Sequence, residues 1–144
     1  MESDKLNALG PLMNEIGQEL ADAVGGGPNG VFFYVEAGEG WHRPSIFKDE
    51  GAVVRYYDPA SNDLGDLIFD LWYFESDETK RWSVMEYAVT DGKFEVTFKY
   101  PEEIDVTKPD RERRRAAVRA RFGDKQVVYP PTQEGALEYK PDAP

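Results

Sequence analysis

The chain has 144 residues, with 28 Asp and Glu against 17 Lys and Arg, and its formal net charge is −11. Its apolar share of 40%, with eight Phe, eight Tyr and three Trp, is too high for a disordered acidic chain, and the absence of Cys excludes disulfides, thiolate metal sites and Cys nucleophiles. Eight basic and three acidic residues between 108 and 125 give that segment a charge of +5, so the rest of the chain carries −16.

The first half of the chain predicts one helix followed by three strands. Apolar residues recur at helical spacing over 6–24, and Gly10-Pro11 predicts a kink inside this helix. The run Gly25-Gly26-Gly27-Pro28 predicts where the helix ends, because glycine takes left-handed geometry and proline cannot continue a helix. Short apolar runs predict strands at 31–35, 45–47 and 52–57, which we expect to form an antiparallel meander.

The second half predicts a helix, a hairpin and a last helix. Ser61 or Asn62 is the expected cap of a helix that ends near Ser76. Asp91-Gly92 predicts a tight turn between strands at 82–90 and 93–100, because both central residues of such a turn need positive φ. An Arg-rich helix is predicted over 109–122, ending at Gly123, and residues 127–129 are predicted to be extended.

These elements predict an α+β fold with an antiparallel sheet of about five strands, two packing helices and a C-terminal Arg-rich helix. We expect residues 1–129 to form a single domain and residues 130–144 a Pro-containing tail. The acidic start does not resemble a signal peptide and no apolar run has the length of a membrane span, so a cytoplasmic protein without a membrane partner is expected. No catalytic or cofactor motif is present, so we expect a protein that is not an enzyme and holds no cofactor.

Three segments of the chain form a recognisable series. The first is residues 12–20, Leu-Met-Asn-Glu-Ile-Gly-Gln-Glu-Leu, and the second is the helix over 63–72 followed by Trp82 and the hairpin over 86–100. The third is the Arg-rich helix closing on Arg121-Phe122-Gly123. In their order and spacing these segments, which span about residues 4–123, resemble the YezG-like immunity proteins, domain-of-unknown-function family 600.

The resemblance implies a bacterial immunity protein, that is, an antitoxin encoded beside a secreted polymorphic toxin. It implies that the partner is this cognate toxin, typically a nuclease, and that neutralisation proceeds by binding rather than by catalysis. The resemblance carries no site residues over to this chain. The candidate sites below therefore depend on the residues alone.

The second helix predicts an acidic stripe next to two aromatic side chains. At 100° per residue Asp63, Asp66, Asp70 and Asp77 fall on one side of this helix, and Phe69 and Tyr73 lie beside them. Such a surface suits the basic cleft of a nuclease, because carboxylates can occupy phosphate positions and aromatic side chains can anchor the interface. The alternative is an ordinary solvated helix face in which another element covers Phe69 and Tyr73. A Ca²⁺ or Mg²⁺ site on the same stripe has no support from loop glycines or EF-hand spacing.

The Arg-rich helix offers a second, basic surface, represented by Arg111, Arg114, Arg115 and Arg119. A nucleic-acid- or adaptor-binding module is the alternative function that this helix suggests. Direct nucleic-acid binding is disfavoured, because the remaining charge of −16 repels a polyanion. A charged helix that pairs with the protein's own carboxylates is the simplest interpretation, and a homodimer contact between the basic and acidic helices is a further one.

His42 is the only histidine of the chain, and it stands between Trp41 and Arg43 after a Gly-rich segment. A catalytic base is one role for such a residue. No nucleophile motif or metal-ligand partner accompanies it, so we interpret His42 as a turn residue.

Overall fold

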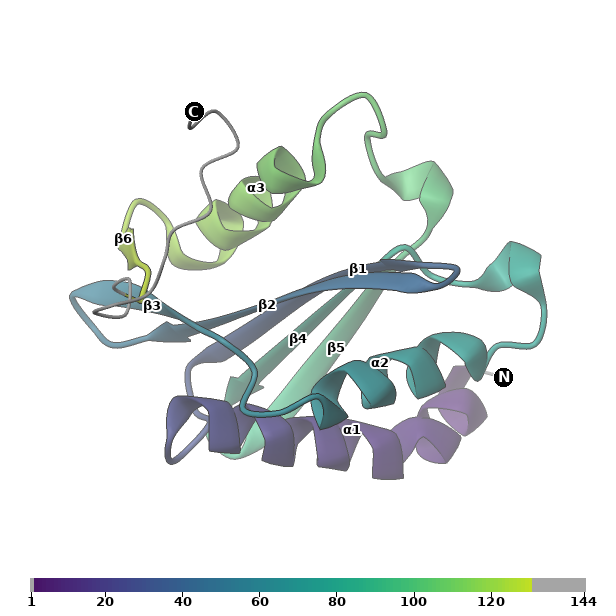
Figure 1. Ribbon diagram of the computed structural model, residues 1–144, viewed down its shortest axis with the longest axis horizontal. Coiled ribbons are helices and arrows are strands. Elements are labelled where there is room, and N and C mark those ends of the chain that lie inside the picture. Colours follow the sequence, from purple (N-terminus) through teal and green to yellow (C-terminus); the bar gives the residue numbers. More distant parts are fainter. Residues whose placement is uncertain (1, 131–144) are drawn as a thin grey trace, which may run out of the picture.

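The computed structural model describes residues 2–130, with side chains from residue 7 onward, and the expected tail from residue 131 lies outside the described residues. The fold has three layers, with α1 and α2 on one face of a six-stranded sheet and α3 on the other (Figure 1). The helices are α1 (Glu2–Val24), α2 (Asp63–Tyr73) and α3 (Asp110–Phe122), with short 3₁₀ turns η1 (Glu78–Lys80) and η2 (Pro101–Glu103). The strands are β1 (Val31–Gly38), β2 (Trp41–Asp49), β3 (Val53–Tyr57), β4 (Val84–Thr90), β5 (Lys93–Lys99) and β6 (Gln126–Val128).

The strand order in the sheet is β5-β4-β1-β2-β3-β6, which confirms the α+β class and the meander of the first three strands. The expectation of about five strands, all antiparallel, is wrong at one edge, because β6 is a sixth strand and runs parallel to β3. Val54 lies opposite Val127 in this pairing. The predicted extended segment after the Arg-rich helix is thus part of the sheet, and the sheet is mixed.

Strand β1 is buried on both of its faces, which explains its continuous apolar sequence. Val31, Phe33 and Val35 point toward α1 and α2, whereas Phe32 and Tyr34 belong to the core beneath α3. Alternate residues of a strand face opposite sides, so β1 contributes to two separate apolar cores. The two cores hold the helices on their respective faces of the sheet.

Helix α1 packs through residues that recur every three or four positions, and Leu9, Met13, Ile16 and Leu20 are all buried. The helix begins at Glu2 and continues without interruption past Pro11. At Gly17 helix α1 lies against the Tyr87 side chain of β4, and a Cβ at this position would come within 2.9 Å of the Tyr87 hydroxyl. That hydroxyl donates a 2.9 Å hydrogen bond to the Met13 carbonyl, which links α1 to β4.

Strand β2 begins at Trp41, four residues earlier than predicted, and His42 is therefore in a strand rather than in a turn. The proline at position 44 does not prevent this extension. Strand β3 pairs only with 46–49, so at Pro44 the side of β2 away from β1 has no strand neighbour, and a proline is tolerated at such an edge. The turn at Asp91-Gly92 has the predicted positive φ values, 52° and 76°.

Candidate acidic binding face

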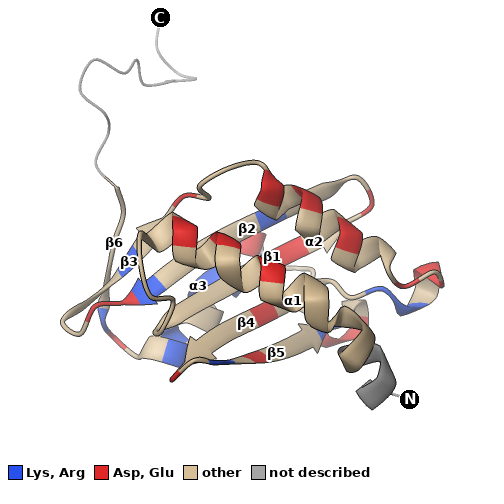
Figure 2. Ribbon diagram, turned by 90° about the horizontal axis from the view of Figure 1, so that it is seen from below, with Lys and Arg blue, Asp and Glu red and all other residues tan. Residues whose placement is uncertain are grey.

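Helices α1 and α2 together form an acidic face on one side of the sheet (Figure 2). Asp63, Asp66 and Asp70 are exposed on α2, as predicted, and Glu15 and Glu19 join them from the neighbouring helix α1. We call these five carboxylates the acidic face. Neither helix carries a Lys or Arg between residues 7 and 24 or between 63 and 74, so no cation of these segments interrupts the face.

A groove of about 390 Å³ lies between the two helices and is lined by members of the acidic face, namely Glu15, Glu19, Asp63 and Asp66, with Gln18 and Leu67. A second hollow of about 530 Å³ adjoins it through Asp66 and reaches His42 and Phe69. The local sequence favours this arrangement, since Asp63 and Asp66 stand in the first turn of α2, where the helix dipole stabilises negative charge. The Ser61 hydroxyl accepts from the Asp63 N–H and donates to Glu19, which joins the start of α2 to α1.

The carboxylates of the acidic face have no cationic partners among the described residues. The ion pairs among the described residues use other carboxylates. These pairs are Arg43–Asp110, Arg55–Glu50, Lys80–Asp77, Lys99–Glu86, Arg113–Glu36 and Lys125–Asp49. Like charges on neighbouring helices repel, so they cost stability unless a partner neutralises them.

Asp77 does not belong to this face, and its predicted place in the acidic stripe is wrong. Helix α2 ends at Tyr73, and Asp77 caps the turn η1 by accepting from the Thr79 N–H and hydroxyl. The chain turns away early because residues of the following loop fold back onto the helix. Arg81 donates to the Glu75 carbonyl at 2.8 Å, and the Trp72 indole N–H donates to the Trp82 carbonyl.

Phe69 is half-buried and is not the exposed anchor that the stripe predicted. The His42 ring covers it edge-on, with ring centroids 4.7 Å apart. A Cβ at Gly65 would come within 2.9 Å of the His42 Nε2, so this glycine lets the histidine fit beneath α2. Burial lowers the pKa of His42, and the nearby Asp66 charge opposes this shift only in part. His42 is therefore a packing residue between β2 and α2.

Two aromatic side chains remain exposed at the C-terminal end of α2. Tyr73 is 44% exposed, as predicted, and the adjacent Phe74, which the helical stripe did not include, is 46% exposed. The Arg81 guanidinium lies 4.8 Å from the Trp72 ring and 5.0 Å from the Tyr73 ring. Tyr73 also accepts a 3.3 Å hydrogen bond from the Gly40 N–H, so its ring is held in place.

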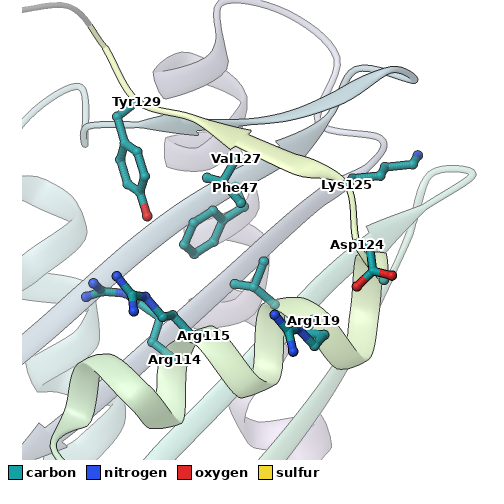
Figure 3. Close-up of a pocket in the computed structure, with 10 residues that line it drawn as sticks. Phe47, Arg114, Arg115, Arg119, Asp124, Lys125, Val127 and Tyr129 are labelled. Carbon is teal, nitrogen blue, oxygen red and sulfur yellow. The ribbon is translucent and has the colours of Figure 1, made fainter.

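Helix α3 lies on the opposite face of the sheet and is attached through Arg113 (Figure 1). Arg113 donates to both oxygens of Glu36 at 2.7 and 3.0 Å, and Glu36 is only 3% exposed. This pair confirms that one arginine of the helix is neutralised internally. Four further arginines have no carboxylate partner among the described residues, namely Arg111, Arg114, Arg115 and Arg119. The last three line a pocket beside β6 (Figure 3). Arg111 is exposed and does not line this pocket.

The described residues hold no group of three His, Asp or Glu side chains that could bind a metal ion. None of the helices in the described part of the chain is long and apolar enough to cross a bilayer. No protein-family model matches the chain, and no curated protein matches it either.

Proposed function

We propose that this protein is a non-catalytic immunity protein that binds and neutralises a cognate toxin in the bacterial cytoplasm. The observation that carries the proposal is the acidic face, in which two packed helices present five carboxylates with no described cation beside them. The resemblance of residues 4–123 to YezG-like immunity proteins supports the same role. The partner surface is then basic, as in the substrate cleft of a nuclease.

The proposed contact combines charge with aromatic anchoring. Carboxylates at the groove between α1 and α2 steer a basic partner and occupy its phosphate-binding positions. Tyr73 and Phe74 lie at the end of the same helix and supply apolar contact area, and aromatic residues of this kind dominate binding energy in many interfaces. Tyr73 is held by Gly40 and Arg81, so little side-chain entropy is lost when it binds.

The test of this function is neutralisation by charge-reversed variants. The tagged protein first identifies the toxin by capture from lysate of its source bacterium at low salt and at about 0.15 M salt. Asp66→Lys with Asp70→Lys is then expected to abolish protection of cells that express the toxin and to weaken binding at least a hundredfold. Thermal unfolding verifies that the variant is folded.

The matched control is Glu95→Lys with Glu112→Lys, which changes the net charge by the same amount. Glu112 is on α3, and both side chains are exposed away from the acidic face. This control is expected to keep protection. Equal loss in the two double variants would show that only net charge matters, and full protection by the Asp66 and Asp70 variant would contradict the placement of the contact.

A nucleic-acid- or adaptor-binding module is the alternative function, and the specific observation that favours it is the set of unpaired arginines on α3. The rest of the chain, at −16, opposes binding of a long polyanion. Measuring the affinity for duplex DNA and single-stranded RNA against salt distinguishes this alternative. A steep fall in affinity with salt would support it, since each neutralised phosphate releases counterions.

A further inference from the structure

A pocket of about 200 Å³ lies between α3, the sheet and β6 (Figure 3). It is on the opposite face of the sheet from α1 and α2, which carry the acidic face (Figure 1). Its floor is apolar and includes the buried Phe47 with Val118 and Val127. Arg114, Arg115 and Arg119 line it from the helix, and Tyr129, which is 55% exposed, lines it from the segment after β6. The pocket thus combines several guanidinium groups with an accessible aromatic ring.

The charge on the walls of the pocket is not balanced within the described residues. Lys125 also lines the pocket, but its ammonium group is turned away and donates to both oxygens of Asp49 at 2.9 and 3.0 Å (Figure 3). The three arginines have no described carboxylate partner, and Asp124 is the one acidic residue among the lining side chains. The pocket therefore carries an uncompensated charge of about +2 when it is empty.

This charge matches that of a phosphate monoester, which carries about −1.5 to −2 at neutral pH. Guanidinium groups are suited to such a ligand, because they donate paired hydrogen bonds to phosphate oxygens. Arg114 and Arg115 extend toward the side of the pocket that holds the Tyr129 hydroxyl, so a ligand held by them lies beside that ring (Figure 3). The pocket is smaller than the usual range of about 300–1,000 Å³ for ligand sites, so the part of a ligand that enters it is compact and the rest lies against the exposed Tyr129.

We propose that this pocket binds the phosphate monoester group of a small planar molecule, of the mononucleotide class. The phosphate lies beside Arg114 and Arg115, Arg119 adds positive charge further along the helix, and the planar group packs against the exposed Tyr129 ring (Figure 3). A compact dianion fits this site better than a long polyanion, because the −16 carried by the rest of the chain repels phosphates that extend beyond the pocket. This ligand site is separate from the acidic face, so its test does not depend on the immunity function.

Isothermal titration calorimetry with adenosine 5′-monophosphate, inorganic phosphate and adenosine tests the proposal at about 0.15 M salt. The monophosphate is expected to bind, inorganic phosphate to compete with it at higher concentration, and adenosine alone to bind at least tenfold more weakly. The double variant Arg115→Ser with Arg119→Ser is expected to bind the monophosphate at least tenfold more weakly. Both side chains are exposed, so this variant keeps the fold, which circular dichroism verifies.

The matched control is Arg111→Ser with Arg121→Ser, which removes the same charge from α3 at positions that do not line the pocket. This control is expected to change the affinity less than twofold. Three outcomes would overturn the proposal: no binding of the monophosphate at millimolar concentration, equal loss in both double variants, or tighter binding of a single-stranded oligonucleotide that both double variants reduce alike.

Discussion

Glu36 is the buried charge through which α3 is attached to the sheet. It accepts a 2.6 Å hydrogen bond from the Tyr34 hydroxyl in addition to the two from Arg113. Burial raises the pKa of Tyr34, and its hydrogen bond with Glu36 adds to this shift. Arg113 also donates to the carbonyls of Asp105 and Lys108, so one guanidinium joins β1, the preceding loop and α3.

Glu36→Gln is expected to reduce the free energy of unfolding by about 3 kcal/mol, because it leaves Arg113 without its partner in a largely buried position. Urea denaturation measures the effect. The control is Glu50→Gln, which breaks the more exposed pair with Arg55 and is expected to cost clearly less than Glu36→Gln, because water screens the exposed pair. Similar losses in the two variants would contradict the anchoring role of Glu36.

His42 predicts a pH dependence that can be assigned to one residue, since the chain has no other histidine. Burial lowers the pKa of His42 in the folded protein, so the unfolded chain binds a proton more readily. The stabilising contribution is therefore present above the ordinary value of about 6.5 and is lost as pH falls through the lower folded pKa. The urea concentration at the unfolding midpoint is expected to decrease as the pH is lowered from about 7.5 to about 5.5, a range in which few other side chains titrate.

His42→Gln is expected to flatten this part of the pH profile. An NMR titration of the His42 ring protons in the native protein gives the folded pKa directly. A folded pKa at or above the ordinary value, or an unchanged pH profile in the variant, would show that the ring is not desolvated between β2 and α2.

At the scale of elements, the approach of α1 to the sheet depends on the absence of a side chain at Gly17. Alanine would improve the helix propensity by about 1 kcal/mol. Its Cβ would, however, meet the Tyr87 hydroxyl at 2.9 Å, in a contact held by the hydrogen bond to Met13. We expect Gly17→Ala to reduce stability by about 1–3 kcal/mol, because overpacking outweighs the gain in propensity.

A double-mutant cycle with Tyr87→Phe isolates this contact. Tyr87→Phe alone is expected to cost about 1 kcal/mol through the lost hydrogen bond. In the Tyr87→Phe background Gly17→Ala is expected to be neutral or stabilising, since the clashing hydroxyl is gone. Additive effects in urea denaturation would show that Gly17 is not needed for the helix-to-sheet contact.

At the scale of the whole molecule, the acidic and basic helices lie on opposite faces of the sheet (Figure 1). If α3 of one copy contacted α2 of another, α2 of the first copy and α3 of the second would therefore both point outward. Such a head-to-tail contact does not close into a symmetric dimer. We therefore do not expect the homodimer between these two helices, which the charge pattern suggested, to form as a closed pair.

We expect a monomer of 16.3 kDa by sedimentation equilibrium, at both low and moderate salt. The net charge of −11 keeps copies apart when screening is weak, and the opposed faces prevent a closed pair when it is strong. A discrete dimer that saturates with concentration would contradict this expectation. A rise in mass without a plateau would instead indicate head-to-tail chains.

Sequence patterns correctly predicted the elements whose ends are determined by residues close by in the sequence. The Asp91-Gly92 turn and the third helix, from Pro109 to Gly123, are examples. The pairing of β1 with β4 and of β3 with β6 joins residues far apart in the chain, and no single segment encodes it. The length of β2 was missed for the same reason, because its N-terminal half is a strand only through its pairing with β1.

At the candidate site, too, features set by local sequence were predicted and features set by tertiary contacts were not. Helical periodicity placed Asp66 and Asp70 correctly on the exposed side of α2, but it extended the stripe to Asp77 because the helix end depends on contacts from Arg81. The spacing of Glu15 and Glu19 by four residues was a visible sign of a second acidic row. Only the packing of α1 against α2 brings the two rows together. A charged Glu36 within an apolar strand was an equally visible sign of a buried ion pair.

The parallel pairing of β6 with β3 has a consequence for the order of folding. Val53 and Gln126 are paired across a loop of more than seventy residues, whereas the β1–β2 and β4–β5 hairpins close over a few. Closing long loops is slow, because the entropy is lost before the contacts form. On a ribosome the hairpins and α1 can assemble early, and β6 joins only after residue 128 has emerged. The pocket between α3 and β6 is then completed only when β6 pairs with β3.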